Sequence, residues 1–228
     1  MKNIIVTGAT GNLGTEVVRT LHDKGHRVHG TVGGAMPPTE MMDMFQSARQ
    51  VDLIDAGASQ EFVEALIGEN KKLDAAVMLV GGFAAGSIET TDLAAIDKQI
   101  ALNFKTAYNI VRPMMAHFEK TGGGQFVFVG ARPALDAEAG KNLVAYSLGK
   151  SLVFQLAEIV NAAGKGKRIS ATVIVPSTID TQPNRQAMPD ADFTKWVKAS
   201  DLAEAIAFVL SETGGNLREG VLKMYSES

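Results

Sequence analysis

A tyrosine and a lysine stand four residues apart in the segment V-A-Y-S-L-G-K, residues 144–150. Four residues make about one turn of an α-helix, so Tyr146 and Lys150 would lie on one helix face. A lysine ammonium close to a phenol favours the phenolate and lowers the phenol pKa from its ordinary value of about 10. The pair is therefore a candidate for proton transfer, with Tyr146 as the proton donor. Ordinary surface pairs share this spacing, so the pair needs support from the rest of the chain.

A glycine-rich segment, T-G-A-T-G-N-L-G at residues 7–14, directly follows the first apolar run of the chain. Glycines between a strand and a helix allow a tight turn, close approach of the backbone to a pyrophosphate, and close packing of the helix. The free amides at the helix start then face the phosphate charge. The position of the segment favours a dinucleotide loop over a tight turn without a ligand. Its predicted contact residues are Gly8, Thr10, Gly11, Asn12, Leu13 and Gly14.

The end of the second apolar run, R-V-H-G-T-V-G-G at residues 27–34, is where a carboxylate would bind the adenosine ribose of NAD. Thr31 and Val32 occupy this place, and Gly33 and Gly34 follow. Neither a carboxylate nor a cation is present, so the choice between NAD and NADP stays undecided. Replacing Val32 with Asp is expected to shift the protein toward NADH.

Short β-branched apolar runs alternate with longer amphipathic segments along the chain. This pattern predicts an α/β fold with a single doubly wound (Rossmann) parallel sheet of about seven strands and helices on both faces. The expected strands cover residues 3–7, 27–32, 50–53, 75–80, 125–129, 169–175 and 221–224. The expected helices cover residues 13–24, 59–69, 91–121, 143–161 and 200–210. No internal repeat or Gly/Ser linker divides the sequence, so one nucleotide-binding domain over residues 1–228 is expected.

The composition is ordinary for a soluble globular protein, with 46% apolar and 21% charged residues. A net charge of -3 gives no case for binding nucleic acid or an anionic membrane. No apolar run approaches the ~18 residues of a membrane span. Cysteine is absent and the four histidines form no spaced ligand set, so no metal site is expected. The chain enters an apolar strand at once, without a signal peptide ahead of it, so a cytoplasmic location is expected.

Together these features resemble the short-chain dehydrogenase/reductase family. The resemblance includes the glycine loop, Asn103 in the long helix expected at residues 91–121, Tyr146 with Lys150, and P-S-T-I-D-T at residues 176–181. It implies an NAD(P)H-dependent oxidoreductase with Tyr146, Lys150 and Asn103 as catalytic residues. Lys150 would also hold the nicotinamide ribose, and Asn103 would support Lys150 through water or, alternatively, stabilise a helix bend. The family's usual serine aligns with Ala131, so its hydroxyl is missing.

Three further stretches are similar to the dihydropteridine reductases, a branch of this family: V-G-G-F-A-A-G at residues 80–86, G-A-R-P-A-L-D at 130–136, and the long stretch 179–196. That branch also carries an alanine in place of the serine. The resemblance implies reduction of a quinonoid dihydropteridine to the tetrahydropteridine, with hydride from the nicotinamide and a proton from Tyr146. Phe83 stands where the branch has a tryptophan near the pterin, with core packing as the alternative explanation.

The resemblance also implies the remaining contact residues and the partners. Beyond the glycine loop, the cofactor-binding residues are Thr31, Asp52, Leu53, Gly81, Gly82, Lys150, Pro176, Ile179 and Thr181. The substrate residues are Phe83, Ala131 and Tyr146, and the partner is a small pterin-like molecule. Two other functions stay open: reduction of another quinonoid or carbonyl compound, and NAD(P) sensing by a regulator without turnover.

A homodimer is expected through the helices that contain Asn103 and Tyr146. The resemblance implies a two-fold interface of these helices. Their apolar residues exceed what one sheet face needs, and examples are Ile110, Val111, Met114, Met115, Leu152, Val153, Leu156 and Ile159.

Overall fold

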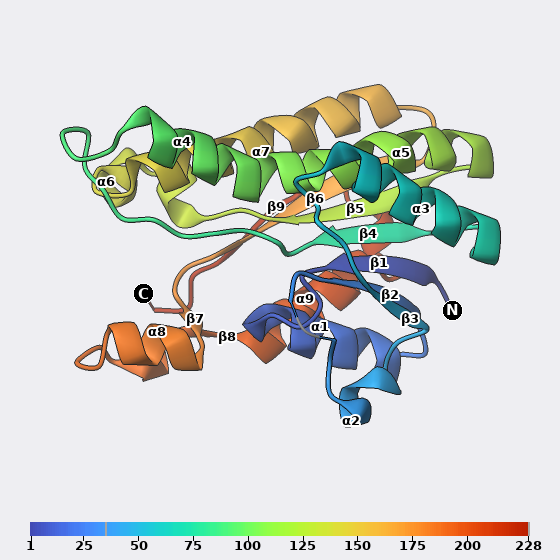
Figure 1. The fold of residues 1–228 in the computed structure, drawn as a ribbon, viewed down its shortest axis with the longest axis horizontal. Coiled ribbons are helices and arrows are strands. Elements are labelled where there is room, and N and C mark those ends of the chain that lie inside the picture. Colours follow the sequence, from blue (N-terminus) through green and yellow to red (C-terminus); the bar gives the residue numbers. More distant parts are fainter. Residues whose placement is uncertain (35, 228) are drawn as a thin grey trace.

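Parallel strands form the centre of the molecule (Figure 1). The computed structural model describes residues 1–34 and 36–227, and within them seven strands form one sheet. These strands are β1 (Asn3–Thr7), β2 (Arg27–Val32), β3 (Ser47–Gln50), β4 (Ala75–Met78), β5 (Gly124–Val129), β6 (Ile169–Pro176) and β9 (Val221–Met224). Their order in space is β3-β2-β1-β4-β5-β6-β9, and all neighbours are parallel. The expected doubly wound fold is confirmed. β7 (Ile179–Asp180) and β8 (Val197–Lys198) form a separate parallel pair.

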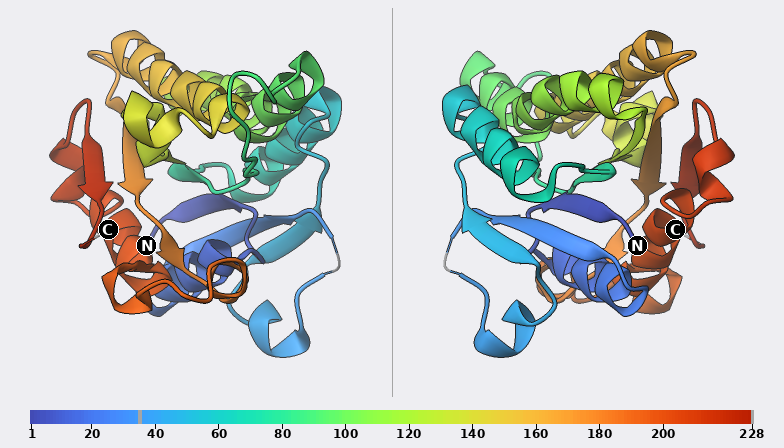
Figure 2. Two further views of the ribbon diagram at one scale, coloured as in Figure 1. Left: turned by 90° about the vertical axis from the view of Figure 1, so that its left-hand side faces the viewer. Right: turned by 90° about the vertical axis from the view of Figure 1, so that its right-hand side faces the viewer.

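Helices cover both faces of the sheet, and the two views of Figure 2 show the resulting layers. On one face, α1 (Asn12–Asp23) packs beside α9 (Ala199–Val209). On the other face lie α3 (Ala56–Asn70), α5 (Thr106–Thr121) and α7 (Val144–Gly164), and α4 (Leu93–Ile100) packs against α7. The short helices α2 (Thr39–Met42), α6 (Ala137–Gly140) and α8 (Gln182–Ala187) lie in connections between the main elements.

Buried apolar side chains hold these layers together. β4 and β6 are buried along their whole length, and parallel strands of this kind need helices on both sides. One apolar cluster packs α3, α5 and α7 against the sheet and includes Phe62 and Phe118. A second cluster packs α1 and α9 against the opposite face and includes Leu21 and Leu202.

The third strand differs from the sequence expectation. A strand at residues 50–53 is wrong, because β3 covers Ser47–Gln50. Oδ1 of Asp52 accepts a hydrogen bond from the N–H of Ile54 at 2.9 Å, and Oδ1 of Asp55 caps α3 by accepting one from the N–H of Ala58 at 2.9 Å. Aspartates that bind nearby backbone amides form turns and helix caps, so the strand ends before them.

The helix expected at residues 91–121 is divided by a π-helical turn. This turn covers Ala101–Lys105, between the end of α4 and the start of α5. The N–H of Thr106 donates to the carbonyl of Ala101, five residues earlier, which is the π-helical pattern. Asn103 lies within this turn. Single π-helical turns inside α-helices are frequent at functional sites.

The strand order reverses between β1 and β4, which defines where a ligand site is expected. In open parallel sheets the site lies outside the carboxyl ends of the strands at this point. Thr7 joins the two strand ends, because its Oγ1 accepts hydrogen bonds from the N–H groups of Leu79 at 3.0 Å and Val80 at 3.4 Å. The glycine loop after β1 is therefore a neighbour of Gly81 and Gly82 after β4.

Two features are absent from the described residues. Within them, no helix is long and apolar enough to cross a membrane. In the same part of the chain, no three His, Asp or Glu side chains gather as ligands for a metal ion.

Candidate active site

The glycine loop turns sharply from β1 into α1. Gly8 has a φ of 64°, a left-handed conformation that glycine adopts without strain. A Cβ atom on Gly14 would overlap the carbonyl oxygen of Gly8 and would lie 2.9 Å from the carbonyl carbon of Ala9. Gly11 is the N-cap of α1 and provides no side-chain cap, so the first amides of the helix stay open to an anion.

The other predicted residues around this loop differ in exposure. Thr10 and Asn12 are exposed, and Leu13 packs partly against the apolar cluster of α1 and α9. Thr31 is only 1% exposed, and its Oγ1 accepts a hydrogen bond from the N–H of Gly8 at 3.3 Å. Thr31 therefore supports the loop from β2, with its hydroxyl turned to the backbone.

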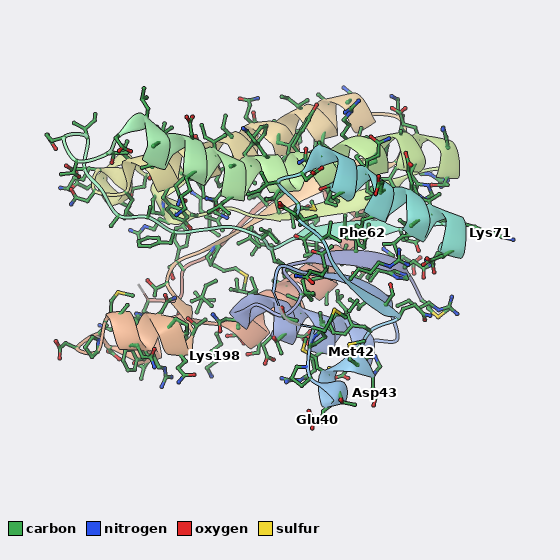
Figure 3. The ribbon with its side chains drawn as sticks, viewed as in Figure 1. Glu40, Met42, Asp43, Phe62, Lys71 and Lys198 are labelled. Carbon is green, nitrogen blue, oxygen red and sulfur yellow. The ribbon has the colours of Figure 1, made fainter. Side chains whose placement is uncertain are left out.

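The end of β2 corrects the expected effect of an aspartate at position 32. Val32 is 0% exposed, so a carboxylate there would be buried at a large cost. A Cβ atom on Gly33 would meet nothing within 4 Å, which makes position 33 the place where a carboxylate would stay solvated. Glu40 lies on α2, on the side away from the sheet, and Asp43 directly follows this helix (Figure 3).

Asp52 and Leu53 have structural contacts. The Asp52 carboxylate belongs to the turn described above, and the Leu53 side chain is 5% exposed in the core. The Leu53 carbonyl accepts a hydrogen bond from Nδ2 of Asn109 at 2.9 Å, which ties the loop before α3 to α5. No contact in the described residues joins Asp52 or Leu53 to Tyr146 or Lys150.

Tyr146 and Lys150 lie one turn apart near the start of α7, as expected. Nζ of Lys150 donates to the carbonyl of Val129 at the end of β5, at 2.8 Å. Burial lowers the pKa of Lys150 to about 8 and raises the pKa of Tyr146 to about 12. The expected net lowering of the Tyr146 pKa is therefore wrong for the protein alone, because burial, which disfavours the phenolate, outweighs the effect of the Lys150 charge. At neutral pH, Tyr146 is a neutral phenol.

Asn103 joins the π-helical turn to the loop after β4. It is 2% exposed; its Nδ2 donates to the carbonyl of Gly82 at 3.0 Å, and its Oδ1 accepts from the N–H of Gly82 at 3.2 Å. A Cβ atom on Gly81 would lie 2.6 Å from Oδ1 of Asn103 and 3.3 Å from Nζ of Lys150. Glycine at position 81 thus lets the amide and the ammonium approach the same point.

Phe83 contacts the ring of Tyr146, and Ala131 lies just beyond β5. The rings of Phe83 and Tyr146 stand edge to face with centroids 5.2 Å apart, and Phe83 is 68% exposed. This exposure argues against core packing as the reason for Phe83. Ala131 is 4% exposed just beyond β5 and presents a methyl group. Ser147, the neighbour of Tyr146, has its Oγ buried beside Gly140.

The segment after β6 is shaped by its own polar groups. Pro176 is the last residue of β6, and Ile179 begins β7. Nδ2 of Asn184 donates to the Ile179 carbonyl at 2.8 Å, and Oγ1 of Thr181 caps α8 by accepting from the N–H of Asn184 at 3.4 Å. Figure 1 shows β7 and α8 at the same edge of the sheet as α6 and the loop before α4.

An ion pair and two tilted aromatic rings in contact stiffen the same segment. Arg185 donates to the two carboxylate oxygens of Asp180 at 2.6 and 2.8 Å. Its guanidinium lies 4.8 Å from the ring centre of Phe193, and that ring packs 4.8 Å from Trp196, which is buried. Residues 179–198 are therefore held in a defined conformation at the carboxyl edge of the sheet. This segment is called the flap below.

Three contributors to this site were missed by sequence reasoning. Gln99 contacts Asn103, Val129 holds Lys150, and Asn184 ties Ile179 to Thr181. Gln99 had a signal, since it stands four residues before Asn103 on one helix. Val129 acts through its backbone carbonyl, so its residue type carries no signal.

Comparisons with known proteins agree with this geometry. The short chain dehydrogenase family model matches residues 2–192. Dihydropteridine reductase of Dictyostelium discoideum is 26% identical over 211 residues, which cover 90% of this chain and 86% of that protein. The 2-(R)-hydroxypropyl-CoM dehydrogenase of Xanthobacter autotrophicus is 23% identical over 96% of this chain and 95% of that protein.

Solved structures show the same fold. A short-chain dehydrogenase/reductase from Serratia marcescens has a TM-score of 0.88 at 21% identity and covers 100% of this chain and 98% of its own. The structure of ElxO with NADP bound has a TM-score of 0.89 at 19% identity, covering 98% and 97% of the two chains. The chain therefore belongs to the short chain dehydrogenase family, whose members are NAD(P)H-dependent oxidoreductases.

Proposed function

We propose that this oxidoreductase reduces a quinonoid dihydropteridine to the tetrahydropteridine with NAD(P)H. The observation that carries the proposal is the exposed ring of Phe83, which stands edge-on to Tyr146. A flat heteroaromatic substrate can pack on an exposed aromatic ring and take a proton from the neighbouring phenol. The likeness to the Dictyostelium enzyme supports this substrate class.

The methyl group of Ala131 fits the same substrate. A carbonyl oxygen gains from a hydroxyl donor that holds and polarises it during reduction. A quinonoid dihydropterin is reduced within its ring system, which carries polar atoms of its own. An alanine at this position is therefore compatible with turnover of a pterin.

The residues present fit a dinucleotide. Gly14 packs directly against the Gly8 carbonyl oxygen with no room for a side chain, and the first amides of α1 are uncapped at this tight turn. The glycine loop would hold the pyrophosphate, Lys150 the nicotinamide ribose, and Ile179 and Thr181 the carboxamide and phosphates. When bound, the nicotinamide supplies the hydride.

Tyr146 supplies the proton, directly or through water. Its raised pKa keeps the phenol protonated at neutral pH, so the donor form is the resting form. The charge on Lys150, one helical turn away, stabilises the phenolate that is left after transfer. Asn103, beside Lys150, completes the group.

Stopped-flow reduction of freshly generated quinonoid dihydropterin, with NADH and NADPH side by side, tests the function. We expect rapid oxidation of the nucleotide in step with pterin reduction. Faster turnover of quinones or ketones than of the pterin would favour another substrate class. Nucleotide binding in a calorimeter without turnover of any acceptor would favour a regulator.

Replacing Ala131 with Ser separates a pterin site from a carbonyl reductase that has lost its hydroxyl. We expect pterin turnover to change by less than about tenfold, since the ring needs no such donor, and ketone turnover to stay low. Steady-state rates on both acceptors measure this. A large gain on ketones, with pterin turnover lost, would contradict the pterin assignment.

Discrimination between NADH and NADPH should be loose, within about tenfold, because neither a carboxylate nor a cation follows β2. Gly33→Asp should shift the preference toward NADH, since its carboxylate would repel a 2′-phosphate. Val32→Asp is the comparison, and it should instead lower the melting temperature because position 32 is fully buried. A wild-type preference of about a thousandfold, or ~4 kcal/mol, would mean that another group reads the ribose.

We propose a homodimer through α5 and α7. Five of the apolar residues expected to support it are already buried within the protomer: Ile110, Val111, Met114, Val153 and Leu156. The exposed apolar side chains on these helices are instead Tyr108 at 44%, Leu148 at 46% and Ile159 at 56%. Large apolar side chains left exposed on neighbouring helices are suited to an interface.

Light scattering at micromolar concentration tests the dimer. We expect the wild type to have twice the protomer mass. The Leu148→Glu, Ile159→Glu double variant should be monomeric, because it places charges within the interface. Phe208→Glu is a matched control, since Phe208 is 49% exposed on α9, which covers the opposite face of the sheet. A monomeric wild type would rule out the interface.

A further inference from the structure

Gln99 is a buried polar residue that the proposed mechanism does not use. It lies in the last turn of α4, is 3% exposed, and stands four residues before Asn103. Its Oε1 accepts a hydrogen bond from Nδ2 of Asn103 at 2.8 Å, and its carbonyl oxygen accepts from the same nitrogen at 3.1 Å. Buried amides are costly unless they are paired, so this pair has a defined geometry.

Gln99 accepts two of the four hydrogen bonds that fix which way the Asn103 amide faces, and one of these two is to its side chain. A side-chain amide can turn over and exchange its oxygen with its nitrogen. In the observed orientation, Nδ2 faces three acceptor oxygens, two from Gln99 and one from Gly82, and Oδ1 faces the N–H of Gly82. The reversed orientation would place an oxygen against those oxygens and an N–H against an N–H. Without the side-chain acceptor of Gln99, the observed orientation loses its shortest hydrogen bond.

The orientation matters because Asn103 and Lys150 converge beside Gly81. If Gly81 had a Cβ atom, this atom would lie 2.6 Å from Oδ1 of Asn103 and 3.3 Å from Nζ of Lys150. α4 also approaches α7 closely here, since a Cβ atom on Gly149 would lie 2.8 Å from the carbonyl oxygen of Gln99. An amide oxygen near an ammonium favours the charged form, whereas an amide N–H there would disfavour it.

We propose that Gln99 is a positioning residue that holds the carbonyl end of Asn103 toward Lys150 and so keeps Lys150 charged. The inference rests on the proposed function, in which the Lys150 ammonium holds the nicotinamide ribose and stabilises the phenolate of Tyr146. Gln99 acts through Asn103, and its amide is the link between α4 and the lysine on α7.

Other charged groups near Lys150 do not replace the dipole of the Asn103 side-chain amide. Asp97, Lys98 and Lys105, on α4 and the π-helical turn, are exposed. The guanidinium of Arg132, beyond β5, lies 5.3 Å from the ring centre of Tyr225. Tyr146 is neutral, because burial raises its pKa to about 12. Burial is the cause that lowers the pKa of Lys150 to about 8, so a reversed neighbouring dipole acts on a poorly solvated charge.

Titration of Lys150 by NMR in the nucleotide-free protein tests the proposal. Lysine labelled with ¹³C at Cε reports the midpoint, and Lys150→Arg identifies the signal. We expect Gln99→Met, which keeps the side-chain length without an acceptor, to lower the midpoint by about one pH unit. Gln99→Glu retains an acceptor oxygen and should keep the midpoint at or above the wild-type value. Gln60→Met, at an exposed site on α3, is the matched control and should change nothing.

Two outcomes would overturn the proposal. One is a Lys150 midpoint in folded Gln99→Met within about 0.2 units of the wild type, and the other is a Gln99→Glu midpoint lowered as in Gln99→Met. If circular dichroism shows that Gln99→Met does not fold, Asn103→Ala gives the same test, since it removes Oδ1 and should lower the midpoint. An unchanged midpoint in that variant would equally refute the role. No acceptor substrate is present, so failure of pterin reduction would leave this result intact.

Discussion

Replacing Tyr146 with Phe is expected to slow pterin reduction by about 10²- to 10⁴-fold and to leave nucleotide affinity nearly unchanged. The variant loses the proposed proton donor but keeps the ring that packs against Phe83. It also keeps the hydrogen bond from Lys150 to Val129, which does not involve the phenol oxygen. Single-turnover rates at saturating NADH measure the chemical step, and fluorescence titration measures nucleotide affinity.

Tyr108→Phe is the matched control for this prediction. Tyr108 is a partly exposed tyrosine on α5, and losing its hydroxyl should leave turnover unchanged. Equal pterin turnover in wild type and Tyr146→Phe would remove the tyrosine from the mechanism. A large loss of nucleotide affinity in Tyr146→Phe would show that its hydroxyl serves binding as well.

Replacing Gly14 with Ala is expected to damage both the fold near α1 and nucleotide binding. The added methyl group would overlap the carbonyl oxygen of Gly8, a backbone atom that cannot rotate away. The turn must shift or α1 must move from the sheet, at a cost of about 1–3 kcal/mol or more. Because the same turn is proposed to hold the pyrophosphate, we expect nucleotide affinity to fall at least about tenfold, or ~1.4 kcal/mol. Thermal melting and calorimetric titration measure the two effects.

Gly68→Ala is the control for Gly14→Ala, because it adds a methyl group where there is room for one. Gly68 lies in α3, and a Cβ atom there would meet nothing within 4 Å. Alanine is the better helix former by roughly 0.5–1 kcal/mol, so this variant should melt at or above the wild-type temperature. Wild-type melting and nucleotide affinity in Gly14→Ala would show that the loop adapts more freely than its contacts indicate.

The parts of the fold that the sequence predicts best are those set by local pattern. The apolar runs at residues 3–7, 27–32 and 221–224 coincide with β1, β2 and β9. The glycine loop also lies where its spacing indicates, because the tight turn needs a glycine at each of these positions. β3 was misplaced because Asp52 binds the next backbone amides, a competing local preference that apolar pattern does not register.

The parts that escaped sequence reasoning depend on contacts between distant segments. The π-helical turn occurs where Asn103 forms hydrogen bonds with the backbone of Gly82, 21 residues away. The raised pKa of Tyr146 depends on burial by the whole site, which the spacing to Lys150 does not reveal. Residues 179–196 of the flap could be matched to a family branch, yet the shape of the flap depends on the Asp180–Arg185 pair and on the contact between the Phe193 and Trp196 rings.

The π-helical turn is equivalent to one surplus residue inserted into an otherwise continuous α-helix. Removing one residue from 101–105 would restore the i to i+4 pattern while α4 and α5 keep their faces toward the sheet and α7. Such a deletion would therefore be tolerated by the scaffold but would withdraw the Asn103 amide from the Gly82 backbone. In evolutionary terms, a chain can therefore gain or lose this single residue and keep the same fold.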